Sequence, residues 1–120
     1  MIRDMAFERE RMQALDEFVQ NGGKEEDFVF DARLRRDGTY WAVADDLAYY
    51  RDREPEDIEE ELEELQDDLD EIIELIEELE ETCPDVADPD SDGFEEYEEL
   101  LDQRFCVEFH IRQAMRFLAP

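Results

Sequence analysis

The chain has 120 residues, of which 40 are acidic and 12 basic, so its formal net charge is −28. This length suits a single domain over residues 1–120 with one modest core, and a hydrophobic content of 42% can supply that core. The charge disfavours nucleic acid and anionic membrane surfaces as direct ligands. No apolar run is long enough to span a bilayer, and no secretory signal pattern is present, so we expect a soluble, cytoplasmic protein.

The acidic residues are concentrated in one block. Residues 54–103 contain 26 acids and no Lys or Arg, whereas the rest of the chain holds 14 acids and all 12 bases. The domain therefore divides into a near charge-balanced part, residues 1–53, and an acidic part, residues 54–120. Adaptation to concentrated salt would spread acids over the whole surface, and the block instead favours a surface kept for a partner.

The first expected element is a helix over residues 4–21. Gly22 and Gly23 follow it, where a helix ends in a left-handed cap. Five apolar residues recur at roughly helical spacing in this segment: Met5, Met12, Leu15, Phe18 and Val19.

A period of two residues replaces the helical period from Asp27 onwards. Phe28, Phe30, Ala32 and Leu34 alternate with Val29, Asp31, Arg33 and Arg35, which predicts a strand. Asp37-Gly38 predicts a two-residue hairpin turn, after which residues 39–44 return as a second strand and end in a helical turn. Tyr40, Val43, Leu47 and Tyr50 also fit a helical period, so a helix beginning near Thr39 is the alternative.

A long helix is expected between Pro55, in its first turn, and Pro84, which ends it. Its apolar residues form a heptad seam made of Ile58, Leu62, Leu65, Leu69, Ile72, Ile76 and Leu79. Ile73 and Leu75 widen this stripe and suggest deeper packing in the second half. Ten pairs of acids at i,i+4 each destabilise the helix by ~0.2–0.5 kcal/mol, so the seam must be buried. It packs either on the last helix or on a second copy of the chain, as a homodimer.

Residues 83–93 form a linker, and a last helix is expected from about Glu95 to Leu118. Apolar residues cover most of the circumference of this helix, which makes it the core element. The expected fold is α+β and mainly α: an N-terminal helix, a short β-hairpin, then the long acidic helix and the C-terminal core helix packed as an antiparallel hairpin.

The acidic helix has a charge density close to that of DNA. Sixteen of the 26 residues between Glu56 and Glu81 are acidic. At ~1.5 Å per residue the segment is ~39 Å long, which gives one carboxylate per ~2.4 Å, against one phosphate per ~1.7 Å of duplex. We therefore predict a basic, DNA-binding protein or nuclease complex as the partner. The predicted partner-binding residues are Glu56, Asp57, Glu60, Glu61, Glu63, Glu64, Asp67, Asp68, Glu71, Glu74, Glu78, Glu95, Glu96 and Glu99.

In length, charge and acid-rich helices the chain resembles phage-encoded DNA mimics, such as antirestriction proteins of the overcome-classical-restriction (Ocr) type and several anti-CRISPR proteins. The resemblance covers residues 54–103 and includes no shared motif, so no residue role is carried over. It implies an inhibitor in the host cytoplasm that blocks the DNA-binding groove of a defence or DNA-handling enzyme.

One loop matches the twelve-residue calcium loop of EF-hands, D-x-D-x-D-G-x5-E. The candidate ligands are Asp88, Asp90, Asp92, Phe94 through its carbonyl, Glu96 and Glu99. Gly93 would make the sharp turn of such a loop. Position eight, usually aliphatic, is Glu95, two prolines separate the preceding helix from the loop, and no second loop is present to pair with. Calcium is thus the one candidate cofactor.

Catalytic patterns are lacking, so we expect a protein that is not an enzyme. His110, the single histidine, lies in an apolar helix, where a hydrogen-bonded structural role is expected. Cys83 and Cys106 are too few for a disulfide framework and too far apart in the expected hairpin to be bridged, so both are expected as free thiols. Arg33, Arg35 and Arg36 are expected to pair with neighbouring acids.

Three functions follow in order of preference. The first is a DNA-mimic inhibitor, the second a calcium-binding helical module, and the third a salt-adapted structural or coiled-coil protein.

Overall fold

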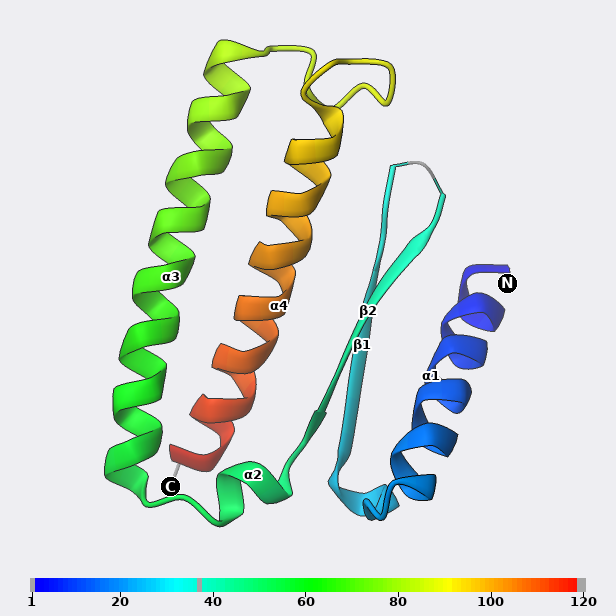
Figure 1. Cartoon of the computed structure of the whole chain (residues 1–120), viewed down its shortest axis with the longest axis vertical. Coiled ribbons are helices and arrows are strands. Elements are labelled where there is room, and N and C mark those ends of the chain that lie inside the picture. Colours follow the sequence, from blue (N-terminus) through cyan, green and yellow to red (C-terminus); the bar gives the residue numbers. More distant parts are fainter. Residues whose placement is uncertain (1, 37, 119–120) are drawn as a thin grey trace.

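The computed structural model of the protein describes residues 2–36 and 38–118. In chain order the elements are α1 (Ile2–Gln20), a 3-10 turn η1 (Glu25–Asp27), β1 (Phe28–Leu34), β2 (Tyr40–Asp46), α2 (Ala48–Arg51), α3 (Pro55–Thr82) and α4 (Phe94–Leu118). This order confirms the expected mainly helical fold with one β-hairpin. The elements form successive layers, with α1 on one face of the two-stranded sheet, α4 on the other, and α3 outside α4 (Figure 1).

Helix α1 ends at a glycine pair, as the sequence predicts. Gly22 has a φ of 96°, and its N–H donates to the carbonyl of Val19 at 3.0 Å. Gly23 donates to the carbonyl of Phe18 at 3.0 Å, which completes a Schellman motif. A side-chain carbon at Gly23 would lie 2.5 Å from the Phe18 ring, so this close approach needs glycine.

The apolar face of α1 differs from the set read from the sequence. Leu15 is buried, and the Phe18 ring contacts the Phe28 ring of the sheet with centroids 5.3 Å apart. Met12 and Val19, in contrast, are exposed at 50% and 48%. The sheet is narrow, so it covers only the side of α1 that carries Leu15 and Phe18.

The two strands pair antiparallel, from Phe28 opposite Asp46 to Leu34 opposite Tyr40. The alternative of a helix beginning near Thr39 is therefore wrong for residues 40–46, whose backbone pairs with β1. The predicted helical turn does follow, as α2.

The hairpin turn is one residue longer than the dipeptide Asp37-Gly38 predicts. Arg35 N–H donates to the Thr39 carbonyl, and Gly38 N–H to the Arg35 carbonyl, so three residues join the last bonded pair. Gly38 has a φ of 89°, the left-handed position that three-residue hairpin loops require. Asp37 itself lies outside the described residues.

Each face of the sheet contacts a different helix. Phe28 and Phe30 lie on the α1 side, where Phe30 meets Phe7 at a centroid distance of 5.3 Å. The polar alternate residues, Asp31 and Arg33, lie on the other face and contact α4. The polar side of β1 is therefore the inner side, between the sheet and the core helix.

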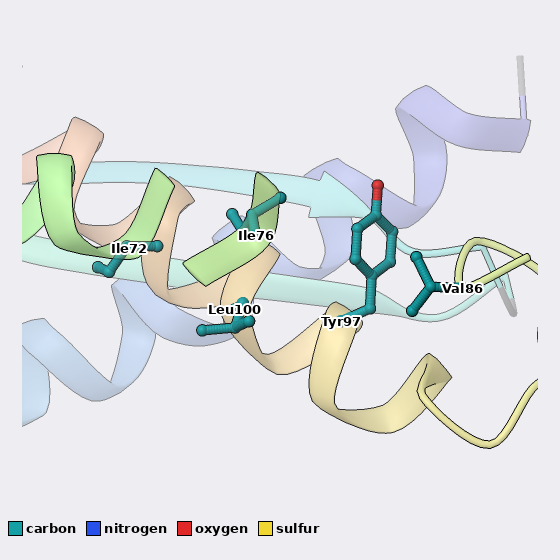
Figure 2. Packing of buried hydrophobic residues seen from close by; sticks show 5 residues of the cluster. All are labelled: Ile72, Ile76, Val86, Tyr97 and Leu100. Carbon is teal, nitrogen blue, oxygen red and sulfur yellow. The ribbon is translucent and has the colours of Figure 1, made fainter. Parts of the chain in front are cut away.

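Helices α3 and α4 pack as the expected antiparallel hairpin (Figure 1). Figure 2 shows Ile72 and Ile76 of α3 beside Leu100 and Tyr97 of α4, with Val86 of the linker next to the Tyr97 side chain. A second cluster at the other end of the hairpin contains Tyr50, Ile58 and Ala114. The heptad seam of α3 is thus buried on α4 within one chain, the first of the two arrangements that the sequence left open.

The packing of α3 departs from expectation at Leu75. This side chain is 44% exposed, although the wider stripe in the second half suggested deep burial. Leu75 lies at the edge of the stripe, since the adjacent Ile72 and Ile76 occupy the central seam positions. As expected, α4 is the core element, with Phe109 and Ala114 exposed at only 2% and 0%.

Candidate functional site

The candidate site is the outer surface of α3. Fifteen of the sixteen carboxylates between Glu56 and Glu81 are exposed. The exception is the half-buried Glu61, which accepts a hydrogen bond from the Tyr49 hydroxyl at 3.2 Å. Burial and the negative charge of Glu61 raise the pKa of Tyr49. All predicted partner-binding acids of this helix except Glu61 therefore have solvent-facing carboxylates.

A line of acids runs along the side of α3 opposite its buried seam. Its members recur in steps of three, four or seven residues, the spacing of one helix face. They are Glu56, Glu60, Glu63, Asp67, Glu74, Glu78 and Glu81, and each is exposed. Asp70 and Glu71 lie within the one seven-residue interval, between Asp67 and Glu74. At ~1.5 Å per residue this outer line, as we call it, is about 38 Å long.

Within the part of the chain that the structure describes, no base forms an ion pair with the outer line. The acids in the ion pairs of the described chain lie before β1, on the strands or on α4, and none lies on α3. Ten like-charge pairs at i,i+4 thus remain uncompensated, at ~0.2–0.5 kcal/mol each. Burial of the seam, at ~1.5–3 kcal/mol per large apolar side chain, offsets this repulsion. Packing of the seam on α4 therefore holds α3 in place, while the carboxylates of α3 face solvent.

The predicted acids of α4 join this surface at one end of the hairpin. Glu95, Glu96 and Glu99 are exposed in the first two turns of the helix, where negative charge is favourable for the helix dipole. Glu96 and Glu78 line one cavity of about 300 Å³ between the two helices. The structure therefore brings these two predicted acids together across the hairpin.

Two acids of the block face inward, which sequence reasoning missed. Glu98 and Asp102 are only 7% exposed and lie one helical turn apart on the sheet side of α4. Arg33 of β1 donates to Glu98 at 3.0 Å, and Arg35 Nε donates to Asp102 at 3.1 Å. The expectation that these two arginines pair with acids is confirmed. The i,i+4 spacing of the acids and the i,i+2 spacing of the arginines were the available signals.

The predicted calcium ligands are not brought together. No three His, Cys, Asp or Glu side chains within residues 2–36 and 38–118 are grouped to hold a metal ion. Helix α4 begins at Phe94, so the Phe94 carbonyl points along the helix. Asp88 accepts a hydrogen bond from the Asp90 N–H at 3.0 Å, and left-handed backbone occurs at Gly22 and Gly38 but not at Gly93. The segment is a series of tight turns that closes the helical hairpin.

Its glycine has a packing role instead. A side-chain carbon at Gly93 would lie 3.1 Å from Cγ2 of Val86, a buried residue of the linker. The Ser91 hydroxyl donates to the Val86 carbonyl at 3.3 Å and holds the same turn. The linker thus folds back over the end of the α3–α4 core (Figure 2).

The histidine and the two cysteines, the remaining chemically active side chains, lie in partly buried positions. His110 Nδ1 lies 3.1 Å from Asp45 Oδ2, and this hydrogen bond raises the pKa of His110 even though burial lowers it. Cys83 and Cys106 are free thiols, as expected. Burial, and to a lesser degree Asp45, raise the pKa of Cys106. A raised pKa lowers the thiolate fraction and hence the nucleophilicity of this cysteine.

The sequence matches no protein-family model, and no curated protein or solved structure is significantly similar to the chain. Among the helices of the described residues, none combines the length and apolar character needed to cross a membrane.

Proposed function

We propose that the protein is a non-enzymatic inhibitor that mimics DNA and occupies the basic DNA-binding surface of a restriction, CRISPR or other DNA-handling protein. The observation that carries this proposal is the outer line of α3. It is a row of exposed carboxylates about 38 Å long, and none of them forms an ion pair with a base among the described residues. Its partners would be Lys and Arg side chains of another protein.

Two properties of α3 support this function: its charge density and the like-charge repulsion that destabilises it. Acids on α3 supply one charge per ~2.4 Å of axis, close to the ~1.7 Å per phosphate charge of duplex DNA. A solvated helix face normally mixes bases among its acids, because oppositely charged pairs at i,i+4 stabilise it. Helix α3 forgoes that stabilisation along its whole length. A surface that is kept acidic against its own stability fits a cationic partner.

Such a target places the protein in the cytoplasm, which for a phage-encoded inhibitor is that of the host cell. Association with a basic groove would be fast and strongly salt-dependent, as for DNA itself. The inhibitor and DNA would compete for one surface, so duplex DNA should release the partner.

The test is affinity capture from a bacterial lysate, with elution by duplex DNA and identification by mass spectrometry. The decisive variant replaces Glu56, Glu60, Glu63 and Asp67 by Lys. The matched control replaces Glu8, Glu10, Asp16 and Glu17, exposed acids of α1, by Lys and shifts the net charge equally. We expect the α3 variant to lose the captured DNA-binding protein and the α1 variant to keep it.

Equal capture by the two variants would refute the proposal, because the outer line would then contribute no more than net charge. Capture of a partner that DNA does not displace would refute it as well. Circular dichroism of both variants checks that the helices persist.

A further inference from the structure

A groove runs between α3 and α4 along one side of the helical hairpin. Two cavities form it, of about 420 and 300 Å³, and both are lined by Leu75. The first reaches from Asp68 to Cys106, and the second continues to Thr82 and Glu96. From Asp68 to Thr82 the groove follows α3 for about 21 Å, at ~1.5 Å per residue.

The floor of the groove is apolar. Its side chains come from both helices: Ile72, Leu75 and Leu79 from α3, and Leu100, Cys106 and Val107 from α4. Leu75, at the edge of the buried seam, is the most accessible of them at 44%. This apolar floor interrupts an otherwise highly charged surface on the helix pair.

The rim of the groove is acidic. Asp68, Glu71 and Glu78 stand on the α3 side, and Glu96 stands on the α4 side. Neither cavity is lined by Lys or Arg. A segment that covers the apolar floor must therefore carry positive charge at its own edges.

The geometry favours a helix as this segment. Both walls are helices whose backbone groups are already bonded, so an extended peptide finds no sheet edge to join. A third helix packs between two antiparallel helices by placing its side chains in the grooves of both. About 21 Å corresponds to four turns of helix, with apolar residues at i, i+3, i+4 and i+7. Flanking Lys or Arg side chains are long enough to reach the rim while their stems cover apolar surface.

We infer that this groove binds a basic amphipathic helix of the partner protein, with an apolar residue over Leu75. The inference rests on the proposed function in so far as the partner is the same DNA-binding protein. The groove's preference for a basic amphipathic helix can be measured without that partner.

The probe is a synthetic peptide of about 18 residues, with Leu at helical spacing and Lys elsewhere. Its control is a peptide of the same composition whose leucines are scrambled off one face. We expect the amphipathic peptide to bind at least tenfold more tightly than the scrambled one. This affinity ratio cancels the general attraction between any cationic peptide and an acidic protein.

Two measurements locate the binding. Leu75→Gln should reduce the ratio to near one, whereas Met115→Gln, which changes an exposed apolar residue of α4 outside the groove, should leave it unchanged. Alkylation of Cys106 by iodoacetamide should slow at least fivefold with the amphipathic peptide bound. Cys83, which packs against the core cluster and does not line the groove, serves as the internal control.

Equal affinity for the two peptides would overturn the inference, as would a ratio that Leu75→Gln leaves unchanged. The variant with four lysines on the outer line separates this outcome from failure of the proposed function, since none of its changed residues lines the groove. Suppose that variant keeps both the affinity ratio of the two peptides and the capture of the DNA-binding partner. The DNA-mimic proposal then fails, and the groove inference stands.

Discussion

Arg33 of β1 donates a hydrogen bond to Glu98 of α4 at 3.0 Å, across 65 residues of chain. Both side chains are largely buried, and Asp102 contacts the same guanidinium. The arginine lies between the sheet and the core helix and pairs with two carboxylates there, which would otherwise repel each other. This contact attaches the near charge-balanced part of the chain to the acidic part.

We predict that Arg33→Met lowers the free energy of unfolding by about 3 kcal/mol, because it leaves the buried Glu98 without its counter-charge and Asp102 with Arg35 alone. Adding Glu98→Leu should restore at least half of the loss. Urea denaturation measures both. Arg112→Met is the control, since its pair with Asp31 is solvent-exposed and should contribute less than about 1 kcal/mol. A loss below about 1 kcal/mol for Arg33→Met would show that the buried cluster does not hold the layers together.

The periodicities of the sequence predicted the elements and their order, because each is a local property. The apolar residues change from a period of 3.6 to a period of two at Asp27 and return to 3.6 at Pro55. The hairpin lies between these two positions, as predicted. Gly22 and Gly23 ended α1 for the reason expected, a left-handed cap.

The partition of the acids could not be predicted, because it depends on contacts between distant segments. Glu98 and Glu99 are identical neighbours in the sequence, yet the first is buried against the sheet and the second is exposed. Neighbouring residues of a helix point about 100° apart, and the tertiary packing turns Glu98, not Glu99, toward Arg33 on the opposite layer. The calcium-loop prediction failed for a different reason. The residue types had the right spacing, but spacing alone does not specify the backbone conformation that would turn their oxygens toward one ion.

The second prediction concerns pH. The hydrogen bond that the His110 ring donates to the Asp45 carboxylate is the main cause of the raised pKa of His110, and burial opposes it. A raised pKa in the folded state means that the pair stabilises the protein fully below about pH 6.5 and loses this contribution as the pH rises through the folded pKa. The stability difference between the native protein and His110→Gln should therefore be larger at pH 5.5 than at pH 8.5.

Urea denaturation at the two pH values tests this difference. An NMR titration gives the pKa directly, because His110 is the single histidine. Asp45→Asn should return the pKa toward its ordinary value. A measured pKa at or below 6.5 in the native protein would contradict the hydrogen bond between these two side chains.

The third prediction concerns calcium. We expect no saturable calcium binding at low millimolar concentration, because α4 already includes Phe94, Glu96 and Glu99 and no three acids of the described chain converge. Isothermal titration calorimetry in buffer of constant ionic strength measures it, with magnesium as the comparison. Asp92→Asn should behave like the native protein. A calcium-specific heat signal that Asp92→Asn removes would restore the calcium module as a function.

The last prediction sets stability against binding on α3. Glu64 is exposed and lies four residues from both Glu60 and Asp68, so it takes part in two like-charge pairs. Glu64→Lys converts both into attractive pairs and should raise the free energy of unfolding by about 1 kcal/mol. Glu64→Gln, which only removes the repulsion, should give about half of that gain.

Binding of the captured DNA-binding partner should change in the opposite direction, with Glu64→Lys weaker than Glu64→Gln and both weaker than the native protein. Urea denaturation and competition with labelled duplex DNA measure the two quantities on the same samples. A solvated face without a partner would show the stability gain alone. If stability rises while affinity for the partner falls, the acidic surface serves binding. If stability rises and affinity is unchanged, the acids of α3 are only a solvated face.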